Sequence, residues 1–277
     1  MSTGTTRTEG VVVVGGGQAG FSVASTLRAR GYTGPVTVFA AEPHLPYQRP
    51  PLSKKAHTEP DELRVSLVPE SFYAERHIEL RLGDGVIALD LAARTVRTRA
   101  GGHVPYAHLV LATGARNRPC PSPAPTWPAS TPARSTTPWL SAGLWRRPVT
   151  WSSSAAASSG SNSPRSPEPA APRVTVVELA DRLLSRAVSP QLQEHLRQRH
   201  EESGVRVLTG TAVHAVEGTD RVRQVVTSAG ILPADLVVYG IGAVPRDELA
   251  RDAGLAVDDG VLVDEQLRSV TDRGSPP

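Results

Sequence analysis

The sequence predicts an α/β protein with a parallel sheet, and three neighbouring stretches carry this prediction. Residues 11–14 are four valines that run straight into glycine, which is typical of a buried central strand. Apolar residues then recur at helical spacing through residues 21–30, and Gly31 stands where a helix would stop. A second apolar strand is expected at residues 36–39. Together these stretches predict a βαβ unit.

The turn between the first strand and the helix has the spacing G-x-G-x-x-G, formed by Gly15, Gly17 and Gly20. The first glycine permits a tight turn, the second lets the backbone approach a pyrophosphate, and the third allows the helix to pack closely on the strand. Gln18 and Ala19 lie within this turn, and the N-terminus of the helix that follows supplies free N–H groups and a positive dipole end that favour phosphate. The turn therefore predicts a dinucleotide site, and the alternative is a glycine turn that serves packing alone.

An acidic residue and a stiff segment follow the second strand. Glu42 has the spacing expected of a carboxylate that accepts a hydrogen bond from a ribose hydroxyl. Residues 43–54 contain several prolines, which favour an extended segment over a helix. Such a segment would hold Arg49 and Lys54 in fixed positions against a cofactor, although an ordinary proline-rich loop with solvated cations remains the alternative.

Composition excludes several function classes. The net charge is +3 over 277 residues, but residues 119–173 hold five arginines against one glutamate, so the rest of the chain is close to neutral. No basic stripe with interleaved aromatic residues is present, which argues against a nucleic-acid partner. The single cysteine, Cys120, excludes an internal disulfide and a C-x-x-C redox pair.

Neither a membrane segment nor a metal site is predicted. No apolar run approaches the length of a membrane span, and residues 1–10 lack the core of a signal peptide, so a cytoplasmic protein is expected. His195 and His200 lie five positions apart on a polar helix, which is not a spacing typical of metal ligands. No catalytic acid, base or nucleophile stands out.

Longer strings point to a known family. GGGQAG and PYQRPPLSK flank the predicted acid, and LRLGDGVIALD and LVLATGA follow within residues 80–115. In this combination the chain resembles the flavin-dependent ferredoxin reductases of bacterial oxygenase systems, which have the pyridine nucleotide-disulfide oxidoreductase fold. The resemblance covers residues 10–118 almost continuously. It implies a fold with two dinucleotide-binding domains, FAD as cofactor, NADH as co-substrate and a small iron–sulfur protein as electron acceptor.

The resemblance also implies roles for individual residues. The glycine turn would hold the FAD pyrophosphate, Glu42 the adenosine ribose, and the backbone of Val86 the adenine, while Arg49 and Lys54 would lie along the flavin. Residues at the end of a later strand would close the FAD pocket, namely Ala112, Thr113 and Gly114. In the NADH domain, Glu178 would accept from the NADH ribose and repel the phosphate of NADPH, and Gly242 would lie near the nicotinamide.

The character of the sequence changes abruptly at Pro119. Residues 119–172 contain twelve of the 25 prolines and all four tryptophans. A disordered Pro/Ser linker is one interpretation, but four tryptophans are unusual in a linker, and the family would place an NADH-binding βαβ unit here.

A shifted reading frame offers another explanation. When each third base is joined to the first two bases of the next codon, residues 151–162 permit the string VVVVGGGFIGLE, and residues 120–131 and 135–142 also permit family-like strings. Our hypothesis is that residues 119–173 are a frame-shifted version of the nicotinamide-binding segment. We expect this stretch to be irregular.

The normal pattern resumes at residue 174. A strand at residues 174–177 ends at Glu178, a helix begins after Ser189 and ends near Gly204, and short strands continue to residue 240. Residues 240–245, GIGAVP, match another family motif, although a buried strand that ends in a glycine turn would have the same pattern.

The sequence thus predicts four regions. Residues 1–118 would form the N-terminal part of the FAD domain, 119–173 the aberrant stretch, 174–239 a partial NADH domain, and 240–277 a truncated return to the FAD domain. The expected function is an FAD-dependent NADH oxidoreductase that is impaired as written. The alternative is a non-catalytic Rossmann fragment that binds FAD or ADP at best.

Overall fold

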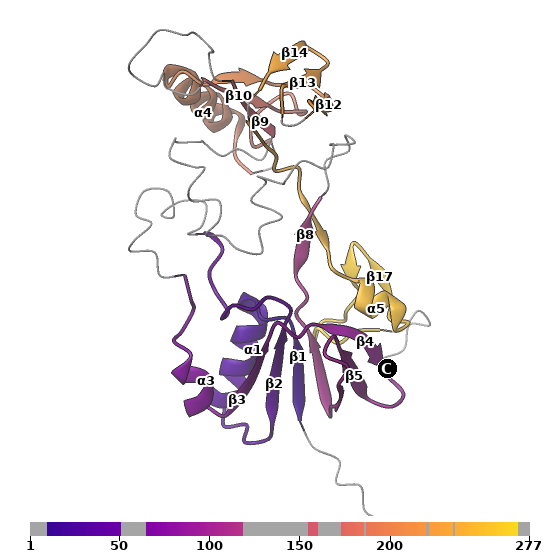
Figure 1. Ribbon diagram of the computed structural model, residues 1–277. Helices are drawn as coiled ribbons and strands as arrows, with labels where there is room; N and C mark the ends of the chain where they lie inside the picture. Colours follow the sequence, from indigo (N-terminus) through magenta and orange to yellow (C-terminus); the bar gives the residue numbers. More distant parts are fainter. Residues whose placement is uncertain are drawn as a thin grey trace, which may run out of the picture. The chain divides into compact units, whose positions relative to one another are not determined.

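The chain divides into two compact units. The computed structural model describes residues 10–50, 65–118, 173–185, 187–219, 222–234 and 236–270, together with the backbone of residues 155–159. The first unit takes the chain up to residue 116 and again from residue 244, and the second unit takes residues 117–243 (Figure 1). The second unit is therefore inserted into the sequence of the first.

The first unit contains a four-stranded parallel sheet with the order β3-β2-β1-β7. Its strands are β1 (Val11–Val14), β2 (Val36–Ala40), β3 (Ile78–Leu82) and β7 (His108–Leu111). Val11 pairs with Val36 on one side and with His108 on the other, so β1 is a central strand. Its four valines are all buried, as a central strand covered on both faces requires. The predicted parallel α/β fold is confirmed.

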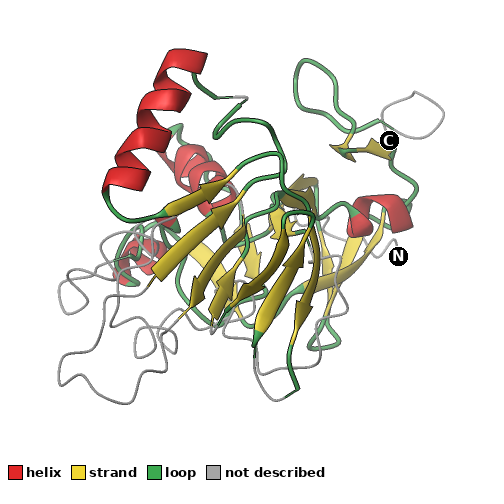
Figure 2. Ribbon diagram, turned by 90° about the horizontal axis from the view of Figure 1, so that it is seen from above, coloured by secondary structure: helices red, strands yellow, loops and turns green. Residues whose placement is uncertain are grey.

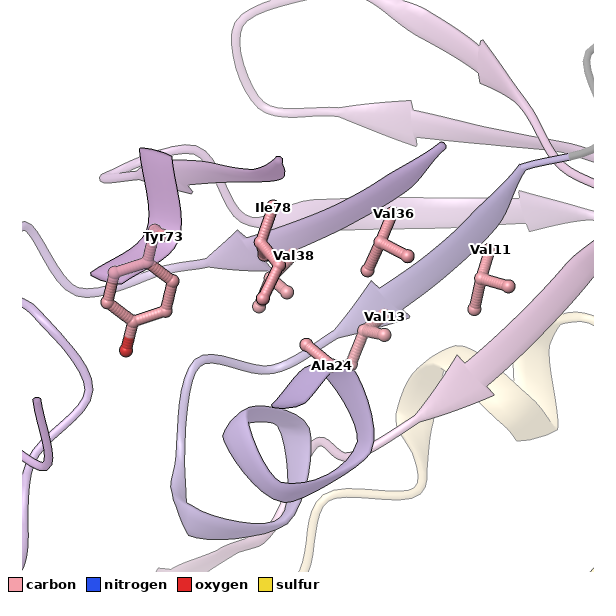
Figure 3. Packing of buried hydrophobic residues seen from close by; sticks show 7 residues of the cluster. All are labelled: Val11, Val13, Ala24, Val36, Val38, Tyr73 and Ile78. Carbon is pink, nitrogen blue, oxygen red and sulfur yellow. The ribbon is translucent and has the colours of Figure 1, made fainter. Parts of the chain in front are cut away.

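The two faces of this sheet pack on different layers. Side chains alternate along a strand, so Val11 and Val13 face one layer and Val12 and Val14 the other. Figure 3 shows the first face, where Val13 lies beside Ala24 of helix α1 (Gln18–Ala29). The short helix α3 (Ser71–Glu75) adds Tyr73 to the same cluster.

A three-stranded antiparallel sheet covers the second face. Its strands are β4 (Val86–Asp90), β5 (Thr95–Thr98) and β6 (His103–Pro105). Val96 of β5 is fully buried and shares a cluster with Val12, Val14 and Phe39. The first unit therefore has a helix–sheet–sheet layering.

The chain returns to the first unit at residue 244, and this returning segment completes the unit. It contains α5 (Glu248–Asp252), which packs on β4, and a small hairpin of β17 (Val257–Asp258) and β18 (Gly260–Val261). Two short strands, β8 (Ala115–Asn117) and β16 (Ala243–Pro245), pair where the chain leaves and re-enters the unit.

The second unit has a four-stranded sheet with the order β11-β10-β9-β15. The strands are β9 (Ala155–Ser159), β10 (Arg173–Val177), β11 (Arg206–Leu208) and β15 (Leu236–Val238). Helix α4 (Pro190–Glu202) connects β10 to β11, which pair in parallel. It begins after Ser189 with proline in its first turn, and Gly204 follows with a φ of +80°, so both predicted helix boundaries are confirmed. Figure 2 shows the helices in red and the strands in yellow.

Another three-stranded antiparallel sheet belongs to this unit. It consists of β12 (Val213–Glu217), β13 (Gln224–Thr227) and β14 (Gly230–Pro233). Val216, Val225 and Leu232 from this sheet share a buried cluster with Val177 of β10. The second unit thus repeats the strand order and the additional sheet of the first.

Strand β9 corrects one prediction. We expected residues 119–172 to be irregular, but Ala155–Ser159 forms a strand between β10 and β15, so the prediction is wrong for these five residues. The edges of two strands offer backbone donors and acceptors, and an alanine–serine segment can satisfy them despite its low strand propensity. β9 runs antiparallel to both neighbours, unlike the first strand of a βαβ unit. The other residues of 119–172 lie outside the described residues.

No helix in the described ranges is both long and apolar enough to cross a membrane.

Candidate dinucleotide site

The predicted FAD-site residues of the first unit gather at one edge of the parallel sheet. β1 ends directly before Gly15, β2 ends two residues before Glu42, and β7 ends directly before Ala112. Because the three strands are parallel neighbours, their carboxyl ends meet at the same edge. Ligands of open α/β sheets bind outside this edge. The fold therefore brings together residues that lie almost a hundred positions apart.

Two glycines of the turn are required by the packing of the protein itself. Gly15 has a φ of +124°, and its N–H donates to the carbonyl of Phe39 at 2.8 Å. A Cβ at this position would lie 2.1 Å from the carbonyl oxygen of Ala112. A Cβ at Gly20 would lie 1.9 Å from the carbonyl oxygen of Gly15. Both glycines permit close backbone approach, so they alone do not distinguish a ligand site from a packed turn.

The surroundings of Gly17 differ from those of Gly15 and Gly20. Its φ of −86° suits any residue, and a Cβ there would meet no protein atom within 4 Å. Gly17, Gln18 and Ala19 are exposed, and the first turn of α1 carries no acidic side chain and no side-chain cap. The first N–H groups of a helix lack acceptors within the helix. The packing of the protein does not explain glycine at position 17, and the approach of a phosphate to these N–H groups stays a prediction.

The carboxylate of Glu42 is held by two side chains from the segment that follows it. The hydroxyl of Tyr47 donates to Oε2 at 2.8 Å, and Nη2 of Arg49 donates to Oε1 at 3.0 Å. Partial burial raises the pKa of Tyr47, and the hydrogen bond to the Glu42 carboxylate and its charge raise it further. The guanidinium of Arg49 also lies 5.9 Å from the centre of the Tyr47 ring.

Backbone pairing fixes the segment that carries these two side chains. The N–H of Gln48 donates to Val65 at 2.8 Å, and the N–H of Leu67 donates to the carbonyl of Pro46 at 2.9 Å. Tyr47 forms the bridge between these bonds, opposite Ser66. The extended segment predicted from its prolines is confirmed at residues 46–48 by this pairing, whereas Arg49 lies in a bend and Lys54 lies outside the described residues.

The turn after β7 is closed by the returning segment. The hydroxyl of Thr113 donates to the carbonyl of Arg246 at 2.6 Å, and the N–H of Arg246 donates to the carbonyl of Gly114 at 2.9 Å. The N–H of Ala112 donates to Val14 at 2.8 Å. These bonds hold residues 112–114 beside the glycine turn.

Val86 opens β4, directly after the loop that follows β3, and is half-buried. The preceding Gly85 packs closely, since a Cβ there would lie 3.1 Å from the Cβ of Ala41. This brings the loop before Val86 against the residue that precedes Glu42. The contact of the Val86 backbone with adenine stays a prediction.

The second unit presents a different arrangement at its predicted NADH residues. Glu178 directly follows β10, and its Oε1 accepts from the N–H of Ala180 at 3.0 Å. Gly242 has a φ of +100°, and its carbonyl accepts from the N–H of Arg118 at 2.9 Å. Because β9 is antiparallel to β10, Ser159 at its carboxyl end pairs with Arg173, at the edge opposite Glu178. A strand-to-helix turn and the acid share one edge in a Rossmann unit, and β9 does not supply that pairing.

The described residues show few other chemical groups of note. Among them, no group of three or more histidine, cysteine, aspartate or glutamate residues is arranged to hold a metal ion.

The sequence did not single out Tyr47 or Arg246 as site residues. Tyr47 had a signal, because a tyrosine between prolines lies five positions after the predicted ribose ligand. Arg246 had none, because it acts through its backbone.

The fold and this turn define a dinucleotide-binding α/β protein of the two-domain kind. The family model described as "Pyridine nucleotide-disulphide oxidoreductase" matches residues 9–138 and 152–273. The chain belongs to this family, and the resemblance found in residues 10–118 is confirmed.

Named relatives have reductase functions. Rhodocoxin reductase of Rhodococcus erythropolis is 38% identical over 265 residues, which are 94% of this chain and 62% of that protein. Rubredoxin-NAD(+) reductase of Pseudomonas putida is 35% identical over 266 residues, 94% of this chain and 68% of that protein. The chain thus spans less than two thirds of the length of rhodocoxin reductase.

Two solved structures of reductases are also similar to this chain. The ferredoxin reductase for the CYP199A2 system of Rhodopseudomonas palustris superposes with a TM-score of 0.79 at 32% identity, over 94% of this chain and 65% of that one. The covalent putidaredoxin reductase–putidaredoxin complex gives a TM-score of 0.75 at 28% identity, over the same shares of both chains.

Proposed function

We propose that the chain binds FAD in its first unit and descends from, or acts as, an FAD-dependent NADH oxidoreductase that passes electrons to a small iron–sulfur protein. The open space at Gly17, on the carboxyl edge beside Glu42, is the observation that carries the FAD site. FAD, when bound, would accept a hydride and release electrons singly.

The residues of the chain would bind and orient rather than react. The N–H groups of Gly17, Gln18 and Ala19 would face the pyrophosphate, and Glu42 would accept from the ribose hydroxyls. The bonded turn at Thr113 would keep residues 112–114 against the cofactor. Arg49 and Lys54 would lie along the flavin.

The names of the relatives support the class of partner. Relatives are called rhodocoxin and rubredoxin-NAD(+) reductases, and a structural neighbour was solved in covalent complex with putidaredoxin. We therefore propose a partner of the ferredoxin or rubredoxin type. Neither a nucleic acid nor a membrane forms part of this proposal, and a cytoplasmic location goes with it because NADH is a cytoplasmic co-substrate.

The co-substrate would be NADH rather than NADPH. Glu178 follows the second strand of the inserted unit, where a carboxylate accepts from a ribose hydroxyl and repels a phosphate. Gly242 would lie near the nicotinamide.

A specific observation favours the alternative, a non-catalytic chain that binds FAD or ADP. The antiparallel direction of β9 separates its carboxyl end from Glu178, so the inserted unit lacks the paired phosphate and ribose contacts in its described part. This alternative keeps the first unit as an FAD site and removes only the reaction with NADH.

The visible spectrum of the purified chain separates the two. A yellow protein whose flavin bleaches on anaerobic addition of NADH, and much more slowly with NADPH, supports the reductase. A yellow protein indifferent to both supports the binding-only alternative. A colourless protein that takes up neither added FAD nor, by titration calorimetry, ADP contradicts both proposals.

A further inference from the structure

The side chain of Glu42, which the proposed function assigns to a ribose, already has a protein partner on each oxygen. Tyr47 donates to Oε2 at 2.8 Å and Arg49 to Oε1 at 3.0 Å. The Glu42 side chain is nevertheless 33% exposed, so these two partners do not enclose it. A carboxylate has about four lone-pair sites. Each oxygen of Glu42 therefore keeps capacity for one further donor.

The two partners differ in how firmly they are placed. The side chain of Arg49 is 67% exposed, and exposed ion pairs order their members weakly. Tyr47 is half-buried, and its backbone lies between two hydrogen bonds to residues 65–67. Tyr47 is thus the partner that can hold the carboxylate in one orientation.

The hydrogen bond from Tyr47 has a fixed direction. Burial and the neighbouring Glu42 carboxylate raise the pKa of Tyr47 above its ordinary value of 10.0, so the phenol keeps its proton at neutral pH. A protonated phenol beside an ionised carboxylate can only donate to it. The carboxylate then presents its remaining lone pairs to incoming hydroxyl groups, which are donors as well.

We propose that Tyr47 is a positioning residue that orients Glu42 toward the vicinal hydroxyls of a ribose. The recognition of an intact ribose in an adenosine diphosphate group would then depend on Tyr47 as well as on Glu42. This inference rests on the proposed nucleotide site of the first unit and adds to it a residue that determines specificity.

The test compares two probes on the full-length chain by titration calorimetry. ADP carries the vicinal hydroxyls, and 2′,3′-dideoxy-ADP lacks them. We expect the unmodified chain to prefer ADP by about a hundredfold or more, as the loss of two hydrogen bonds to a charged group implies. In Tyr47→Phe, the affinity for ADP falls about threefold to fivefold while that for the dideoxy probe is nearly unchanged, so the preference shrinks.

A double-mutant cycle shows whether Tyr47 acts through Glu42. Glu42→Gln should reduce the preference for ADP strongly, and adding Tyr47→Phe to it should reduce the preference little further. Tyr73→Phe is the matched control, because the Tyr73 hydroxyl is buried without a hydrogen-bond partner in the described structure. It should leave the preference unchanged.

Several outcomes would overturn the inference. An equal loss of affinity for both probes in Tyr47→Phe would mean that Tyr47 supports only the structure, because a general disturbance cancels in the ratio of the two affinities. A gain in ADP affinity would mean that Tyr47 competes with the ribose. A chain that binds neither ADP nor FAD would remove the proposed function itself, whereas normal discrimination in Tyr47→Phe removes this inference alone.

Discussion

The two units have the same order of strands, but among the described residues a glycine turn joins the first strand to a helix in the first unit alone. Its sheet has the order β3-β2-β1-β7, and that of the second unit has the order β11-β10-β9-β15. β1 and β9 therefore occupy equivalent central positions. β1 consists of buried valines and is parallel to its neighbours, whereas β9 consists of alanine and serine and is antiparallel to them.

This difference shows that a strand can fill a place in a sheet without supplying its function. Backbone hydrogen bonding is satisfied in either direction, so the sheet of the second unit still forms. A phosphate site has a stricter requirement, because the carboxyl end of the first strand must lie beside the end of the second. The reversed strand β9 places its carboxyl end at the edge opposite Glu178, the predicted ribose ligand.

Restoring the shifted frame is the change with the largest expected effect. A chain in which residues 119–173 carry the shifted reading, with VVVVGGGFIGLE at residues 151–162, should have a parallel first strand and a glycine turn in the second unit. Bleaching of bound flavin by NADH should accelerate by at least about a hundredfold, since a misplaced substrate costs about that much in rate. Stopped-flow absorbance measures it.

The matched control is the same restored chain with the three glycines of the new turn changed to alanine. It should return to slow bleaching. Resequencing the DNA across codons 115–176 provides a direct check, and the hypothesis expects an extra or missing base near codon 119 that is balanced near codon 173. An unaltered gene together with rapid bleaching of the chain as written would contradict the hypothesis.

Alanine substitutions in the glycine turn of the first unit should separate packing from ligand binding. Gly15→Ala and Gly20→Ala would place a Cβ about 2 Å from a backbone oxygen, so each should lower the free energy of unfolding by about 3 kcal/mol or more. Gly17→Ala should change stability by no more than about 1 kcal/mol but weaken FAD binding at least about tenfold.

Urea unfolding and FAD titration measure the two effects. If Gly17→Ala binds FAD as well as the unmodified chain, the open space at this position does not receive a phosphate.

Arg28 offers a smaller test of how the first unit is held together. Its guanidinium donates to four backbone carbonyls from two parts of the chain, those of Tyr32, Gly34, Arg76 and His77, at 2.6–2.8 Å. Arg28→Ala should destabilise the unit by about 3 kcal/mol, because several acceptors lose a charged donor at once. Arg28→Lys should recover part of this loss.

Arg197 of the second unit is the comparison, since it pairs only with glutamates exposed on the surface of α4. Arg197→Ala should have a much smaller effect on thermal unfolding. A loss as large as that of Arg28→Ala would contradict this account.

The smallest expected effect concerns the dependence of the stability of the first unit on acid pH. Burial by itself would raise the pKa of Glu79, but hydrogen bonds from Thr37 and Arg81 outweigh it and keep the pKa below its ordinary value of 4.5. A lowered folded-state pKa stabilises the fold above the unfolded value, and this contribution is lost as the pH falls below about 4.5.

Thr37→Val should therefore flatten the dependence of stability on pH between about 5 and 3, with little change at pH 7 beyond the lost hydrogen bond. Unfolding by urea at several pH values measures it. An unchanged slope would show that Thr37 does not set the pKa of Glu79.

Local sequence patterns predicted several elements of both units. The valines of β1, the helical spacing of α1 and the proline at the start of α4 each determine local structure within a few residues. No local sequence pattern predicted the contacts between distant segments. The bond from Thr113 to the carbonyl of Arg246 joins residues 133 positions apart, and Arg28 reaches carbonyls 48 and 49 positions away.

The strand β9 was missed for a related reason. Alanine and serine have low strand propensity, so Ala155–Ser159 gives no local signal. Its conformation is determined by the open edges of β10 and β15, which only the tertiary structure reveals.

The nested order of the two units has a consequence for synthesis on the ribosome. Every residue of the glycine turn, Glu42 and the turn at Thr113 is translated before residue 119, whereas Arg246, which closes that turn, is translated after the whole inserted unit. At about 5–20 residues per second, the first sheet has several seconds to assemble while the insert is being made. A sequence error inside the insert is therefore translated only after the strands of the first sheet have been synthesised. The entropic cost of the final closure grows only slowly with the length of the insert.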